Sequence, residues 1–290
     1  MSVNSESGFS PLITVVMPVY NGEKYLGQAL QSLIEQDFSR WTVIVVDDGS
    51  DDGSAEIAGS ISDPRVRIHR LGTNQGISVA LNAGIEMANT EFIARLDADD
   101  IALPQRLRVQ YEFLQHHPHV GVVGTWAEII GDRSLASKPP ASHEKLVAEM
   151  LWRNPLIHSS VMFRRSALPL ETGPYRSEWE PCEDYDLWAR LSSHVDLAVI
   201  PQTLTRHREH PEQISTIGHK AASEKEKRTA IALRHRSSLG FSPGRSVLPT
   251  SFLAANLPRF FSPSWPGAVQ RRVVMAAFVR WLRDRLRGLK

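Results

Sequence analysis

The sequence predicts an α/β fold in which a mostly parallel sheet is flanked by helices. Over the first hundred residues, short apolar runs alternate with stretches that carry apolar residues at helical spacing. Such alternation is typical of parallel strands whose connecting helices cover both faces of the sheet. Acidic residues directly follow two of the apolar runs. Because ligands bind beyond the carboxyl ends of strands in such sheets, we expect both acidic clusters to meet in one crevice.

The individual elements follow from period and composition. Strands are predicted where apolar, β-branched residues run together, at 13–19, 41–46, 66–69, 91–96, 120–126, 161–164 and 195–200. Helices are predicted where the apolar spacing is near 3.6 residues, at 23–36, 77–88, 104–116, 144–151, 183–191 and 219–238. A Pro- and Ser-rich connector at 243–266 then leads to an amphipathic helix at 273–289.

Charge divides the chain into two unlike parts. Residues 220–290 contain 15 Lys and Arg against three Asp and Glu, whereas residues 1–219 contain 18 against 29. No stretch approaches the roughly 20 apolar residues that cross a bilayer, and no signal peptide is predicted. The single cysteine, Cys182, cannot form an internal disulfide. We therefore expect a cytoplasmic protein whose basic tail and acidic body meet different partners.

Three carboxylates crowd the loop after the predicted strand 91–96. Asp97, Asp99 and Asp100 repel one another unless a cation lies between them. Oxygen ligands on such a loop suit Mg²⁺ or Mn²⁺, which bind one or two carboxylates and complete their shell with water and phosphate oxygens. A solvated turn is the competing interpretation of this cluster.

Two further acidic segments also have simpler interpretations. Residues 48–59 partly mimic a calcium loop, but Gly59 stands where a bidentate Glu is required, so that interpretation fails and a plain turn remains. Glu183 and Asp184 begin a predicted helix, where acidic residues also complement the helix dipole.

Taken together, five segments resemble family-2 glycosyltransferases of the Rossmann-like GT-A fold. The resemblance extends over residues 15–188, and its motifs lie at 15–26, 46–50, 74–84, 97–100 and 183–188. It implies an inverting transfer in which Asp184 is the general base that takes a proton from the acceptor hydroxyl. Asp99 would be the direct metal ligand, with Asp97 beside it. The nucleotide-sugar-binding residues implied are Pro18, Val19, Tyr20, Glu23, Asp48, Asn74, Asp97 and Ala98.

The resemblance also divides the chain into functional parts. Residues 1–218 would form the GT-A domain, with 11–105 as the nucleotide-sugar-binding half and 106–218 as the acceptor-binding half. Residues 219–290 would be a basic helical extension. The family's processive synthases carry Gln-x-x-Arg-Trp near the C-terminus. This chain has Arg280-Trp281, but Ala277 stands at the position of the glutamine. Addition of a single sugar from a UDP- or dTDP-linked donor to a saccharide or lipid-linked acceptor, in surface glycan synthesis, is therefore favoured.

Two other functions remain open at this point. A sugar-1-phosphate nucleotidyltransferase also uses a Rossmann-like sheet, but it needs a Gly-rich basic loop, whereas residues 18–23 are acidic with a single glycine. A catalytically silent glycan-binding protein would have no need of Asp99 and Asp184. The motifs around His158 and His207 match weaker features of bacterial members and receive no catalytic role.

The C-terminal residues 271–290 are predicted to bind an anionic membrane surface rather than nucleic acid. They contain seven Lys and Arg and one Asp, with Phe278, Trp281 and Leu282 on another face of the helix. Each basic residue near such a surface contributes about 1 kcal/mol of attraction. We expect the intact protein to sediment with anionic vesicles at low salt, and a chain truncated after Gly267 to stay in the supernatant. Equal sedimentation of both would favour a helix packed on the domain.

Overall fold

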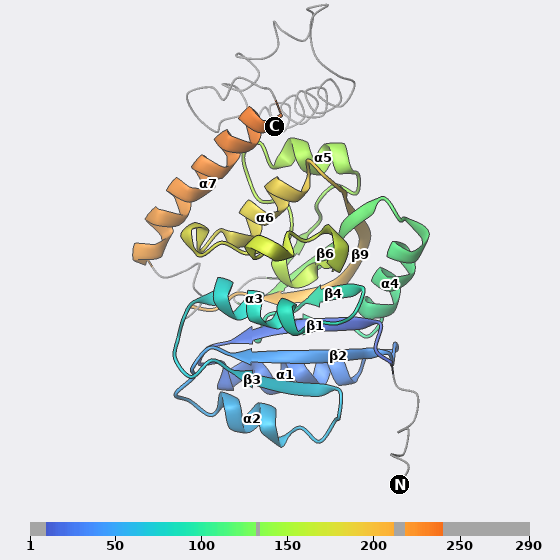
Figure 1. Cartoon of the computed structure of the whole chain (residues 1–290), viewed down its shortest axis with the longest axis vertical. Helices are drawn as coiled ribbons and strands as arrows, with labels where there is room; N and C mark the ends of the chain where they lie inside the picture. The colour runs from blue at the N-terminus through green and yellow to red at the C-terminus, as the bar shows by residue number, and fades with distance from the viewer. Residues whose placement is uncertain (1–9, 132–133, 212–217, 240–290) are drawn as a thin grey trace, which may run out of the picture.

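The computed structural model describes residues 10–131, 134–211 and 218–239, and confirms the predicted α/β architecture. The described strands form one nine-stranded sheet in the order β3-β2-β1-β4-β8-β6-β9-β5, with β7 paired to β6. Helices cover both faces of this sheet (Figure 1). The predicted connector 243–266 and the membrane-binding segment 271–290 lie outside the described residues.

The first half of the sheet is parallel, as its apolar runs predict. Its strands are β1 (Ile13–Val19), β2 (Trp41–Asp47), β3 (Val66–Arg70) and β4 (Phe92–Arg95). The connecting helices are α1 (Glu23–Ile34), α2 (Ser54–Ser60) and α3 (Ile77–Met87). Alternate residues of β1 face opposite ways: Val16 packs with Leu81 of α3, and Val15 packs with Leu26 of α1. Both faces of β1 are therefore buried.

The second half of the sheet is mixed rather than parallel. Its strands are β5 (Ile101–Ala102), β6 (Val120–Ile130), β7 (Leu135–Ser137), β8 (Met162–Arg164) and β9 (Asp196–Arg208). Strand β8 lies antiparallel between β4 and β6, whereas β6 and β9 run parallel. The helices are α4 (Arg106–His116), α5 (His143–Glu149), α6 (Glu183–Leu191) and α7 (Gly218–Ser238). The described part of this half also contains four short 3₁₀ turns: η1 (His158–Ser160), η2 (Arg165–Ala167), η3 (Leu170–Thr172) and η4 (Ser177–Trp179).

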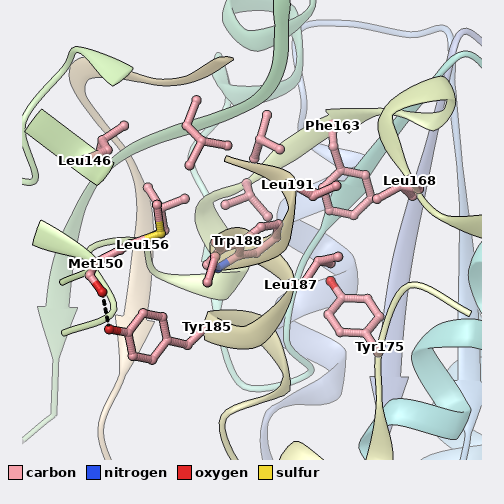
Figure 2. Close-up of a cluster of buried hydrophobic side chains, with 14 of the residues drawn as sticks. Leu146, Met150, Leu156, Phe163, Leu168, Tyr175, Tyr185, Leu187, Trp188 and Leu191 are labelled. Atoms are coloured by element: carbon pink, nitrogen blue, oxygen red, sulfur yellow. Dashed lines mark hydrogen bonds between the residues drawn. The ribbon is translucent and has the colours of Figure 1, made fainter. Parts of the chain in front are cut away.

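Helix α6 is anchored by a large apolar cluster (Figure 2). Trp188 is fully buried, and its ring centroid lies 6.2 Å from that of Phe163 in β8. The Tyr185 hydroxyl donates a hydrogen bond of 2.6 Å to the Met150 carbonyl, so this buried polar group is satisfied. Each such side chain contributes about 1.5–3 kcal/mol through burial. The N-terminal turn of α6, which carries Asp184, is therefore held in a fixed place.

Among the helices that the structure describes, we find none with both the length and the apolar character needed to span a bilayer.

Candidate active site

Asp48, the residue after β2, organises the loop that follows β3. Its backbone N–H donates to the Val19 carbonyl at 2.8 Å, which ties the ends of β1 and β2 together. Its carboxylate accepts hydrogen bonds from the backbone N–H groups of Gln75 at 2.8 Å and Gly76 at 2.9 Å. Gly76 has φ of +97°, a conformation that a side chain would strain. Burial raises the pKa of Asp48 despite these bonds, and the predicted ligand Asn74 is exposed beside them.

The loop after β1 presents one prominent side chain. Pro18 and Val19 are buried within β1, whereas the Tyr20 side chain is exposed. The carboxylate of Glu23 accepts a hydrogen bond of 2.8 Å from the backbone N–H of Gly53 at the start of α2. Of these four predicted nucleotide-sugar-binding residues, Tyr20 is therefore the best placed to cover a ligand, and Glu23 joins two neighbouring loops.

Asp97, beyond the end of β4, is fixed by buried groups beneath it. The Arg95 guanidinium lies 2.5 Å from Asp97 Oδ1, and the Ser159 hydroxyl donates to Oδ2 at 2.5 Å. Burial alone would raise the pKa of Asp97, but Arg95, His158 and Ser159 outweigh it and hold this pKa well below its usual range. Asp97 is therefore a fixed carboxylate anion.

Asp99 has a different environment. Its Oδ2 lies 3.0 Å from Nε2 of His210, a residue just past the end of β9. Burial, followed by the negative charges of Asp100 and Asp97, raises the pKa of Asp99 to about 6. The types of these two side chains suit a divalent cation, because a carboxylate and an imidazole are both common metal ligands. The predicted ligand Asp99 thus has a histidine partner.

Asp100 is buried and serves to attach the end of β9 to the Asp97–Asp100 loop. Its carboxylate lies 3.0 Å from Nδ1 of His207 and accepts a hydrogen bond of 2.7 Å from the backbone N–H of Arg208. Burial alone would lower the pKa of His207, but the bond to Asp100 and the nearby carboxylates raise it to about 9. The Arg208 guanidinium also stacks on Tyr25, 4.4 Å from the ring centroid.

Asp184 lies in the first turn of α6, with its carboxylate oriented by two donors. Asn154 Nδ2 donates to Oδ2 at 2.7 Å, and the Tyr185 backbone N–H donates to Oδ1 at 2.6 Å. Burial nevertheless raises the pKa of Asp184 to about 6. The adjacent Glu183 is 5% exposed, and burial together with the Asp184 charge raises its pKa to about 8.

The structure brings the predicted donor-side and acceptor-side residues within electrostatic reach of one another. The charge of Asp97 contributes to the raised pKa of Asp184, although 87 residues separate them in the chain. Tyr175 connects the two sides: its hydroxyl lies 2.7 Å from His158 Nε2, and its pKa is raised by burial and by the charges of Asp184, Glu183 and Asp97. The segment 154–159 also links the two sides, because Asn154 contacts Asp184 at 2.7 Å and Ser159 contacts Asp97 at 2.5 Å.

Several residues of this site were not predicted from the sequence. Arg95, Asn154 and His210 each contact a predicted carboxylate but carry no recognisable motif of their own. The pair His207 and His210, three residues apart near a strand end, was the one local signal available.

A cavity of about 500 Å³ lies elsewhere, between α6 and α7. Its lining residues are Ala167, Leu168, Pro169, Arg176, Ala189, Arg190, Leu191, Ser193, His194, Arg234, His235 and Ser238. None of the predicted site residues is among them. Its three arginines all contact the fully buried carboxylate of Asp186, with Arg176 Nη2 at 2.5 Å and Arg190 Nε at 2.9 Å. These arginines therefore have a structural task, which is to neutralise Asp186.

We expect Asp186→Asn to lower the free energy of unfolding by about 2 kcal/mol, because it removes charged hydrogen bonds to a buried carboxylate while the partly exposed arginines keep some of their hydration. Urea denaturation should measure this loss. Glu178→Gln is the matched control, since Glu178 lies 3.8 Å from the same Arg176 but is largely exposed. Equal stability of the two variants would show that the Asp186 cluster contributes nothing.

Comparison with known proteins identifies the family. The family model described as Glycosyl transferase family 2 matches residues 14–169. The putative glycosyltransferase EpsE of Bacillus subtilis is 33% identical over 189 residues, 62% of this chain and 66% of that protein. The O-antigen biosynthesis glycosyltransferase WbnJ of Escherichia coli is 30% identical over 187 residues, 62% and 71% of the two chains. In fold, the chain is similar to S. aureus TarS 1–349, with a TM-score of 0.60, 22% identity and coverage of 78% and 72%. This chain therefore belongs to glycosyl transferase family 2 and is a glycosyltransferase.

Proposed function

We propose that this enzyme transfers a single sugar from a nucleoside-diphosphate sugar to a hydroxyl group of a saccharide or lipid-linked acceptor, with inversion at the anomeric carbon. One observation supports the proposal: the short segment 154–159 contacts both Asp184 at the start of α6, through Asn154, and Asp97 after β4, through Ser159. Membership of the family sets aside the nucleotidyltransferase alternative, and the ordered Asp184 carboxylate argues against a silent binding protein.

The donor would lie across the carboxyl ends of β1, β2 and β4. Tyr20 would cover the base and ribose, and the loop held by Asp48 would border the base. Solved structures of the same fold bind different nucleotides: TarS has been solved with UDP-GlcNAc, and the Pyrobaculum calidifontis mannosyltransferase PcManGT with GDP-Man and Mn²⁺. A uridine or thymidine diphosphate remains our proposal for this chain.

A divalent cation would be held by Asp99, with His210 as a second protein ligand. Within residues 10–131, 134–211 and 218–239 no cluster of three or more His, Cys, Asp or Glu side chains forms a metal site alone, so diphosphate and water would complete the shell. When bound, the cation neutralises negative charge on the departing diphosphate. The imidazole ligand favours Mn²⁺ over Mg²⁺, which prefers oxygen.

Asp184 would act on the acceptor. Its carboxylate would accept the proton of the attacking hydroxyl, while Asn154 keeps one oxygen in a fixed direction. Because the proposed base would act on the acceptor and not on the nucleotide, the hydroxyl would approach the anomeric carbon opposite the diphosphate. That geometry gives inversion.

We further propose a place in surface glycan synthesis. WbnJ is named for O-antigen biosynthesis, and AmsE of Erwinia amylovora, 31% identical over 189 residues, for amylovoran biosynthesis. The basic segment 271–290 would hold the enzyme at the inner face of the cell membrane.

The test is a hydrolysis screen of UDP-, dTDP- and GDP-linked sugars with Mn²⁺ and without acceptor. We expect slow release of one nucleoside diphosphate, abolished by a chelator. Calorimetry with UDP, dTDP and GDP serves as the control for binding. If no nucleotide sugar is hydrolysed and no nucleoside diphosphate binds in the presence of Mn²⁺, the proposed function is wrong.

A further inference from the structure

The two carboxylates of the Asp-x-Asp segment are held in unlike ways. Both oxygens of Asp97 are engaged: Arg95 Nη2 lies 2.5 Å from Oδ1, and the Ser159 hydroxyl lies 2.5 Å from Oδ2. The same hydroxyl accepts a hydrogen bond of 2.9 Å from the Asp97 backbone N–H, so side chain and backbone are fixed together. Asp99 Oδ2, in contrast, faces the imidazole of His210.

The groups that hold Asp97 are themselves rigid. Arg95 is 1% exposed and Ser159 is 0% exposed, so water does not compete for these bonds. The Arg95 guanidinium also donates to the Leu96 carbonyl. The backbone of Arg95 is held by Arg106, whose Nη2 donates to the Arg95 carbonyl at 2.7 Å. Ser159 lies in η1, whose end is tied to β4 by the hydrogen bond of 3.0 Å from Arg95 N–H to the Val161 carbonyl.

We propose that Arg95 and Ser159 are positioning residues that assign different tasks to the two carboxylates. They fix Asp97 as an oriented hydrogen-bond acceptor for the donor nucleotide sugar, and they leave Asp99 as the carboxylate that binds the metal. This inference rests on the proposed function. The physical advantage is preorganisation, because an acceptor already in position need not be ordered when the donor binds.

The sharpest test compares two neighbouring serines. Ser159→Ala removes the hydroxyl that holds Asp97, whereas Ser160→Ala removes an equally buried hydroxyl that donates to the Ile157 carbonyl at 2.8 Å instead. We expect Ser159→Ala to weaken Mn²⁺-dependent UDP binding and to raise the donor KM about tenfold, the effect of one lost hydrogen bond to a charged group. Ser160→Ala should leave both values unchanged, and the two variants should have similar melting temperatures. If dTDP or GDP is the nucleotide that the wild type binds, it replaces UDP.

A double-mutant cycle separates positioning from a general structural effect. In an Asp97→Asn background, Ser159→Ala should weaken nucleotide binding by much less than tenfold, because the group that it positions is already altered. If Ser159→Ala does not fold, Arg95→Lys tests the same idea, since a lysine keeps the charge but lacks the planar fork whose two nitrogens contact Asp97 and the Leu96 carbonyl. We expect it also to raise the donor KM.

Three outcomes would overturn the inference while leaving the proposed function intact. These are wild-type nucleotide affinity in Ser159→Ala, an equal loss in Ser160→Ala, and an undiminished effect of Ser159→Ala in the Asp97→Asn background. Failure of the wild-type enzyme itself to bind any nucleoside diphosphate would instead refute the proposed function.

Discussion

Asp184→Asn is expected to lower kcat by about 10²–10⁴-fold, the loss typical of removing a general base. The asparagine keeps the shape of the side chain and can still contact Asn154, but it cannot take a proton. Donor binding should change little, because the role proposed for Asp184 concerns the acceptor. Steady-state transfer assays and calorimetry with UDP and Mn²⁺ measure the two effects separately.

The pH dependence of kcat is a second test of the role proposed for Asp184. Burial raises the pKa of Asp184 to about 6, so the wild-type kcat should fall as the pH falls through 6 and the base becomes protonated. At saturating Mn²⁺, which keeps Asp99 ionised although its own pKa is raised to about 6, the residual activity of Asp184→Asn should lack this acidic limb. Near-normal transfer by the variant would move the base elsewhere, and Glu183 would be the first residue to test.

The predicted strands were most accurate where burial is two-sided. Strands β1 and β2 are buried on both faces, so their apolar runs marked them nearly to the residue. Strand β9 was predicted to end at 200 but extends to Arg208, because pairing with β6 stabilises a polar stretch that has no apolar pattern. Propensity gives no sign of such pairing between distant segments.

Contacts between residues distant in the chain also limited the prediction of the site. The sequence located the acidic segments and, through the strand ends, predicted that they meet. It could not predict that His210 would lie beside Asp99, because that contact joins residues 111 apart and depends on the extension of β9. Only the family resemblance distinguished Asp99 from Asp97, because the physical difference between them lies in the contacts of Arg95 and Ser159 with Asp97.

Asp99→Asn is expected to nearly abolish turnover and to weaken Mn²⁺-dependent binding of the nucleoside diphosphate. The amide keeps the size of the side chain but loses the negative charge that a divalent cation requires. Because Asp97 and Asp100 crowd Asp99, removal of one charge should leave the melting temperature unchanged or raise it, so loss of activity would not reflect unfolding.

The matched control for this variant is Asp37→Asn. Asp37 pairs with Arg108 at 2.8 Å on the surface, and loss of such an exposed pair costs at most about 1 kcal/mol. That variant should retain wild-type turnover and metal dependence. Calorimetric titration of UDP, with and without Mn²⁺, decides the assignment. If Asp99→Asn binds the nucleotide with unchanged metal dependence, the metal is held by other residues, and Asp97 would be the next residue to test.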